Sequence, residues 1–385
     1  MTISVAGGVK TGVVIEVEHR LQQQLIIGKS KPVEVVDELG STVEDDTVDI
    51  EANKLEIERE AIRSRLAKQH QAKSLYNTIS TQLIISANRS IEHQLSSVES
   101  VLLHSKLNEK HILLLEMLYS KQVDLSKVRP LVMGLPWLQR DLLNMINSPA
   151  FRHRRPKTSD VHVADIKLVL NYIGVENLQA LIPYFCLRHL MPREQPQLLW
   201  LTRKIWRYSI ISTIAAQALV TLHGKDRAFF YSCSLLSLLG STCVISNCAK
   251  VFESTWGTWL REASADGDKE LYDAVMAAQL PAADVYEQVL THSGPLNWQL
   301  LEALNFADSR LTKTFKAIDT SLKYSDLDED AKLLERANCF ARVYLLKEAD
   351  NITAAECRTM FDYYEITEQE LIRLNSQNYR KLELL

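Results

Sequence analysis

Glycine and proline are absent from two long stretches of the chain, residues 41–129 and 296–385. These residues are the main breakers of regular structure, and both stretches are rich in good helix formers such as leucine, glutamate, lysine and alanine. Between residues 110 and 320 no strand-like alternation of apolar and polar side chains appears. The sequence therefore predicts an all-α fold.

Spacings that hold metals or carry redox chemistry are also missing. The six cysteines form no C-x-x-C pair, and the ten histidines show neither an H-x-x-x-H nor an H-E-x-x-H spacing. Zinc sites and metalloprotease helices depend on such spacings. We therefore expect reduced, buried cysteines, and we predict no cofactor and no metal.

The sequence also lacks a strong charge of either sign and a long uninterrupted apolar run. The formal net charge is −4, which indicates neither nucleic acid nor an anionic membrane as a partner. Serine and threonine interrupt the longest apolar stretch, residues 229–245, so it is interpreted as a buried core helix and not as a membrane span of ~20 residues. The N-terminus has no charged n-region or apolar h-region of a signal peptide, so a cytoplasmic location is expected.

The beginning of the chain has a different composition. Residues 9–17 and 25–27 are mostly β-branched or aliphatic and lie among glycines, which predicts a short β-hairpin or an extended arm. An acidic stretch, residues 34–60, follows and is interpreted as a solvated linker or helix face. Leu75, Ile79 and Leu83 then repeat at helical spacing. This apolar face must pack on the rest of the chain or on a second copy.

Amphipathic helices with short connections are expected in the middle of the chain. Apolar residues recur at helical spacing in residues 166–173 and again in residues 178–185. Gly174 lies between them, where a glycine ends a helix. The simplest interpretation of these stripes is core packing, and nothing favours a cofactor pocket.

Four segments resemble, in order and spacing, the motifs of the HDOD domain family. They are Pro136-Trp137-Leu138…Leu142-Leu143…Asn147-Ser148, Ile166…Leu170…Ile173-Gly174…Leu178, Trp206-Arg207-Tyr208-Ser209 and Tyr231-Ser232-Cys233-Ser234-Leu235-Leu236-Ser237-Leu238-Leu239-Gly240. The third is similar to the family's Trp-x-His-Ser pattern, and the fourth to its Phe-x-Ala-Gly-Leu-Leu-His-Asp-Ile-Gly pattern. The resemblance covers roughly residues 105–250. It implies an all-helical fold related to the HD phosphohydrolases and a role in bacterial signal transduction, usually through protein contacts.

The chain departs from the HD pattern where chemistry is expected. HD hydrolases hold one or two divalent metals with a histidine, a His-Asp pair and a later aspartate, and the metal activates bound water. On this resemblance Tyr208 replaces the first histidine, and Ser237 and Leu238 replace the His-Asp pair. Leucine cannot bind a metal, and neutral hydroxyls are poor ligands. The resemblance therefore implies a lost metal site and no catalytic residues.

A short basic cluster follows the Asn147-Ser148 motif. It consists of Arg152, Arg154, Arg155 and Lys157. A solvated loop is one interpretation. The other is a contact for an anion or an acidic partner, because arginine forks suit carboxylate and phosphate groups.

These observations predict three segments and favour one function. The segments are an N-terminal extension (1–95), an HDOD-like domain (96–320, with halves 96–195 and 196–320) and a C-terminal helical segment (321–385). The expected function is a non-catalytic signalling or scaffold protein that binds an unknown protein partner, with a possible homodimer through the extension. The alternatives are a metal-dependent phosphohydrolase with unrecognised ligands and an anion or nucleotide sensor that uses the basic cluster.

Overall fold

The protein is described by a computed structural model that covers residues 6–28, 56–120, 122–152, 163–192, 198–380 and 382. Within these ranges the regular elements are helices, and the β-structure is limited to one antiparallel bridge between Val9 and Lys323. The predicted all-α fold is confirmed.

The helices follow one another along the chain with mostly short connections. They are α1 (Gly12–Ile26), α2 (Glu56–Leu95), α3 (Val98–His104), α4 (Glu109–Leu118), α5 (Leu125–Met133), α6 (Pro136–Ile146), α7 (Pro149–Arg152), α8 (Ile166–Ile173), α9 (Val175–Leu190), α10 (Leu199–His223), α11 (Arg227–Leu235), α12 (Leu239–Asp266), α13 (Lys269–Ala277), α14 (Ala282–Ala303), α15 (Arg310–Thr320), α16 (Glu329–Glu348), α17 (Ala354–Tyr363) and α18 (Glu368–Asn375).

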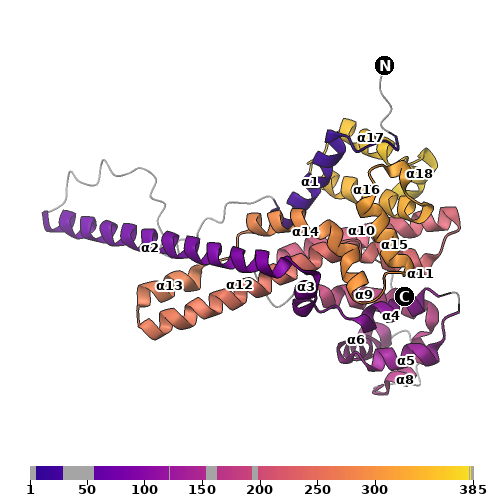
Figure 1. The fold of residues 1–385 in the computed structure, drawn as a ribbon, viewed down its shortest axis with the longest axis horizontal. Coiled ribbons are helices and arrows are strands. Elements are labelled where there is room, and N and C mark those ends of the chain that lie inside the picture. The colour runs from indigo at the N-terminus through magenta and orange to yellow at the C-terminus, as the bar shows by residue number, and fades with distance from the viewer. Residues whose placement is uncertain are drawn as a thin grey trace.

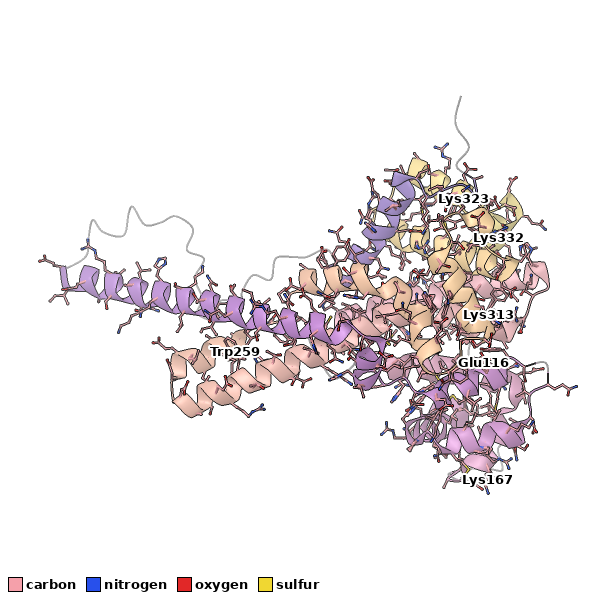
Figure 2. The ribbon with its side chains drawn as sticks, in the orientation of Figure 1. Glu116, Lys167, Trp259, Lys313, Lys323 and Lys332 are labelled. Atoms are coloured by element: carbon pink, nitrogen blue, oxygen red, sulfur yellow. The ribbon has the colours of Figure 1, made fainter. Side chains whose placement is uncertain are left out.

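Three hydrophobic clusters organise these helices. The largest unites α1, α10, α11, the first half of α12 and α14 to α18, and a second is formed by α4 to α9. The third lies along an arm that α2 forms with the far end of α12 and with α13, and this arm projects from the body of the molecule (Figure 1). Trp259 of α12 lies on the arm (Figure 2). Leu83 of α2 is buried in the third cluster, so the predicted apolar face of α2 packs on the chain itself.

Helix α10 runs through the middle of the largest cluster. Alanine, serine and threonine occupy much of its buried surface, so neighbouring helices approach it closely. α16 and α11 pack along it. The helix ends at Gly224 in the left-handed conformation, which glycine adopts without strain. Residues on both sides of the predicted boundary at 320, such as Phe315 and Leu334, belong to the same cluster.

The apolar stretch of residues 229–245 is buried, as predicted, but it forms two helices and not one. A turn at residues 236–238 separates α11 from α12. By length and composition alone, α10 (Leu199–His223) could cross a membrane, and so could the range Arg227–Asp266, which comprises α11 and α12. In the folded protein 67% and 89% of their apolar windows are buried, as in the core helices of a soluble protein.

The prediction of a β-hairpin or extended arm at the N-terminus is wrong. Residues 12–26 form helix α1, and Val14, Val17, Leu21 and Leu25 are buried on one face of it. These positions recur every three or four residues, so burial of this stripe outweighs the strand preference of the β-branched side chains. Most of the acidic stretch lies outside the described residues, and its last five residues begin α2.

The crossing of α12 and α14 leaves no room for a side chain at Gly240. A Cβ atom there would lie 2.1 Å from the backbone oxygen of Ser293. The Gly240 N–H also donates a hydrogen bond to the Asn297 side chain at 2.8 Å. The glycine that ends the fourth family motif is therefore required for close helix packing.

We expect Gly240→Ala to lower the free energy of unfolding by about 1 to 3 kcal/mol, because backbone atoms must move apart. Gly257→Ala, farther along α12, is the matched control. Its Cβ would meet only the end of the Arg261 side chain at 3.8 Å, so it should be neutral or stabilise by up to about 1 kcal/mol. Urea unfolding measures both, and equal stability of the two variants would contradict the packing argument.

Candidate functional site

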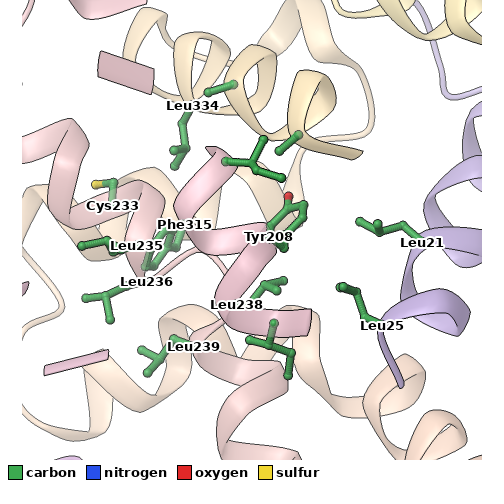
Figure 3. Close-up of a cluster of buried hydrophobic side chains, with 14 of the residues drawn as sticks. Leu21, Leu25, Tyr208, Cys233, Leu235, Leu236, Leu238, Leu239, Phe315 and Leu334 are labelled. Carbon is green, nitrogen blue, oxygen red and sulfur yellow. The ribbon is translucent and has the colours of Figure 1, made fainter. Parts of the chain in front are cut away.

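The residues at the degenerate metal positions lie in the largest hydrophobic cluster. Tyr208 of α10 is 2% exposed, and Leu238, in the turn before α12, is 8% exposed. The Ser237 hydroxyl donates a hydrogen bond to the backbone oxygen of Ser234 at 2.9 Å, so its hydrogen-bonding need is met within the same turn. Figure 3 shows the Tyr208 ring and Leu238 among apolar neighbours. The positions that the sequence resemblance assigns to the metal ligands are thus part of the core.

Helix α1, from the N-terminal extension, covers this position. Leu21 and Leu25 point from α1 toward Tyr208 and Leu238 (Figure 3). Both leucines are nearly fully buried and belong to the same cluster. The extension is therefore part of the core, and it closes the side of the domain on which Tyr208 lies.

A largely buried charged network fixes α1 in place. Arg342 of α16 donates through Nη1 to Glu18 Oε1 at 3.0 Å and to the Tyr364 hydroxyl at 3.0 Å. Its Nη2 lies 3.4 Å from Glu335 Oε2, and the Tyr364 hydroxyl donates to Glu18. Lys10 pairs with the second Glu18 oxygen at 2.9 Å. The Arg342 side chain is only 14% exposed, so water screens these charges weakly.

The network shifts the pKa values of Glu18 and Arg342 toward their charged forms. Burial acts to raise the pKa of Glu18, but Arg342 and Lys10 outweigh it and lower that pKa. Burial acts to lower the pKa of Arg342, but its phenol and carboxylate neighbours outweigh burial and raise that pKa. Both groups are therefore charged at neutral pH, and each is needed to neutralise the other.

The same network reaches α10 next to Tyr208. Asn338 donates to Glu335 Oε1 at 2.9 Å, and the Ser212 hydroxyl donates to Asn338 Oδ1 at 2.6 Å. Ser212 is one helical turn from Tyr208. Burial raises the pKa of the Tyr208 phenol, while Arg342 opposes this shift, so the phenol is neutral and is not an anionic ligand.

These residues do not fit a divalent metal. The three positions offer a neutral phenol, a serine hydroxyl bonded elsewhere and a leucine. In the part of the chain that the structure describes, no three or more His, Cys, Asp or Glu side chains come together in a way that could hold a metal ion.

A stack of three rings joins α4, α6 and α9. Trp137 lies parallel to His189 with ring centres 4.1 Å apart, and the nearly parallel His111 ring lies beside both, 5.3 Å from Trp137 and 5.8 Å from His189. His111 Nδ1 is within reach of the Asn108 backbone N–H at 3.3 Å, in the capping box of α4. The His111 Nε2 and Trp137 Nε1 atoms are buried without a hydrogen-bond partner among the described residues. Burial and then His189 lower the pKa of His111 from 6.5 to about 4.

The sequence could not reveal this stack. Trp137 belongs to the first family motif, but the two histidines have no motif spacing and come from helices that meet only in the fold. The same is true of Glu18 and Arg342, which are 324 residues apart in the chain.

The basic cluster falls almost entirely outside the described residues. Arg154, Arg155 and Lys157 are not described, and Arg152 is the last residue of α7. The structure instead explains the preceding motif residue, Asn147. Its side chain accepts from the Val163 N–H at 3.0 Å and donates to the Val163 oxygen at 2.9 Å, which ties the two ends of this region together. A cleft of about 410 Å³ next to it is lined by residues that include Arg140 and Asn144.

Fold and site together define an all-α protein in which the third and fourth sequence motifs, with Tyr208 and Leu238, are buried in the core. Residues 106–275 match the family model described as HDOD domain. This part of the chain is therefore similar to HDOD domains, and the resemblance found in the sequence is confirmed.

A crystal structure from Shewanella amazonensis SB2B, described as a "Putative metal-dependent phosphohydrolase", is similar with a TM-score of 0.41 and 14% sequence identity. The similarity covers 76% of this chain and 94% of that chain. No curated protein matches the sequence at a significant level.

We expect Arg342→Met to lower the free energy of unfolding by about 3 kcal/mol, because Glu18 and Glu335 then lose their shared cation in a poorly hydrated site. Lys313→Met is the matched control. Lys313 pairs with Asp308 on the surface, where its side chain is 62% exposed, and its loss should change stability by less than about 1 kcal/mol. Chemical unfolding compares the two, and a neutral Arg342→Met would show that the network does not hold α1.

The lowered pKa of His111 makes stability depend on pH. The unfolded chain binds a proton near pH 6.5 and the folded chain only near pH 4, so this contribution is complete above pH 6.5 and is lost as the pH falls toward 4. The loss amounts to about 3 kcal/mol at most.

His111→Gln is the test variant, because glutamine keeps the capping box but does not titrate. Unfolding free energies at about pH 7 and about pH 4.5 should differ less for the variant than for the wild type. An identical pH dependence of both proteins would mean that His111 is not held neutral.

Proposed function

We propose that the protein is a non-catalytic HDOD-type protein of bacterial signal transduction, located in the cytoplasm, that acts by binding another protein. The observation that carries the proposal is the burial of Tyr208 and Leu238 under α1. A catalytic HD domain needs an accessible pocket with imidazole and carboxylate ligands at these positions. Here the positions are apolar or neutral, and the chain's own N-terminal helix covers them.

Two surface features support action through protein contacts. Leu168 and Tyr172, one turn apart on α8, are 60% and 51% exposed, and Phe151 lies against Tyr172. Exposed apolar side chains grouped in this way are typical of interaction surfaces. In addition, the first half of α2 is exposed on nearly all sides among the described residues and projects beyond α13 (Figure 1). We propose this half of α2 as a second interaction surface, in addition to the one on α8, for a partner protein or for a second copy of the chain.

The main alternative is a phosphohydrolase whose metal ligands differ from those of the family pattern. It predicts a tightly bound metal and turnover of phosphoesters, whereas the proposed function predicts neither. The two proposals therefore differ in a quantity that can be measured on the purified protein.

We expect protein expressed with manganese and iron supplied, and then purified, to contain far less than one metal ion per chain. Elemental analysis per chain measures this, with hydrolysis of para-nitrophenyl phosphate and bis-para-nitrophenyl phosphate as the activity readout. One or two tightly held metal ions per chain, or turnover that a chelator abolishes, would overturn the non-catalytic function.

A further inference from the structure

A cleft of about 770 Å³ lies between α9, α10, α11 and the residues around the end of α18. This volume is within the range of small-molecule binding sites. The helices leave a hollow here because three of them present alanine toward it, namely Ala180 of α9, Ala218 of α10 and Ala228 of α11. Tyr208, Ser237 and Leu238 do not line the cleft, so it is distinct from the degenerate metal position.

Two arginines line this cleft without a carboxylate partner. Arg227 donates through Nε to the Gln217 side chain at 3.3 Å, which leaves the other two guanidinium nitrogens free to bind. Among the described residues, the Arg373 guanidinium has no hydrogen bond or ion pair. Other arginines, such as Arg310, Arg336 and Arg342, each pair with aspartate or glutamate. Glu176 also lines the cleft, so two guanidinium groups face one carboxylate there, and neither arginine forms an ion pair with it.

A buried hydroxyl in the wall of the cleft also lacks a partner. Tyr231 of α11 is 6% exposed, and its hydroxyl makes no hydrogen bond within the described chain. A buried hydroxyl without a partner costs about 1 to 3 kcal/mol, so a ligand atom that accepts or donates a hydrogen bond there would be favoured. The rest of the polar lining is largely carboxamide, from Gln217, Gln377 and Asn378, which offers both donors and acceptors.

We propose that this cleft binds a small molecule that carries a phosphate or carboxylate group, with Arg227 and Arg373 on the oxyanion and the carboxamides on the polar remainder of the molecule. Guanidinium groups bind both oxyanions through paired N–H donors. Such a ligand would connect α9, in the HDOD domain, with the C-terminal helix α18. The inference rests on the proposed function only in treating the ligand as a signal, because binding itself needs neither a partner protein nor an inactive metal site.

The test uses the full-length protein and three probes: pyrophosphate, adenosine monophosphate and citrate. Isothermal titration calorimetry gives the affinity, and the thermal unfolding midpoint gives an independent readout. We expect at least one probe to bind, and the comparison of citrate with the two phosphates identifies the oxyanion. Arg227→Ala and Arg373→Ala should each weaken binding about tenfold or more, since hydrogen bonds to charged groups are lost.

Three further variants separate a binding site from general charge effects. Arg203→Ala removes an exposed arginine of α10 outside the cleft and should leave the affinity unchanged. Ala228→Leu fills the hollow and should abolish binding while the far-UV circular dichroism stays the same. Tyr231→Phe should weaken binding but leave the free protein as stable as the wild type or more stable, because it removes an unsatisfied hydroxyl.

No binding of any probe at millimolar concentration would overturn the proposal, and so would equal losses in Arg203→Ala and Arg227→Ala. Neither result would affect the proposed function, which depends on the metal content and on the absence of turnover. Conversely, a metal-containing, active protein could still bind the probes in this cleft.

Discussion

One guanidinium group holds together segments from the two ends of the chain. Arg342 contacts two carboxylates and a phenol that come from α1, from its own helix and from the residue after α17. Charges placed in so poorly hydrated a site are tolerated only when they are paired and hydrogen-bonded. The position of α1, and with it the closure over Tyr208, depends on this set of contacts.

The network and the apolar packing have different roles. Leu21 and Leu25 supply buried area against Tyr208 and Leu238, which favours association of α1 with the core but does not select one orientation. The Glu18 carboxylate can reach Arg342 and Tyr364 in one arrangement only, so it fixes the register of α1. Helix α1 thus covers the part of the core that contains Tyr208 and Leu238.

The sequence allowed the fold class and the family to be predicted, because both depend on local signals. The stripes of residues 166–173 and 178–185 are buried as expected, and Gly174 ends α8 with a positive φ of 76°. The β-branched residues of α1 led to the incorrect prediction of a β-hairpin. Strand preference is weak, and burial of one face of the segment against the core determines that it forms a helix. The division between α11 and α12 was also missed, because leucines and serines at residues 236–238 carry no turn signal.

The site could be predicted only in part, for a different reason. The replaced positions Tyr208, Ser237 and Leu238 follow from motif order, but what surrounds them depends on contacts between distant residues. No local pattern links Glu18 with Arg342, or His111 with Trp137 and His189. The sequence also does not show that Arg227 and Arg373 lack a carboxylate partner, because ion pairing depends on which residues are neighbours in the folded structure.

The location of the partners of α1 has a consequence for biosynthesis. Glu18 leaves the ribosome 324 residues before Arg342, which takes about 15 to 65 s at usual rates of synthesis. Throughout that time Val14, Val17, Leu21 and Leu25 have no α16 or α17 to cover them. Until then α1 can pack only on earlier elements such as α10 and α14, so the face that later meets α16 and α17 stays uncovered during synthesis.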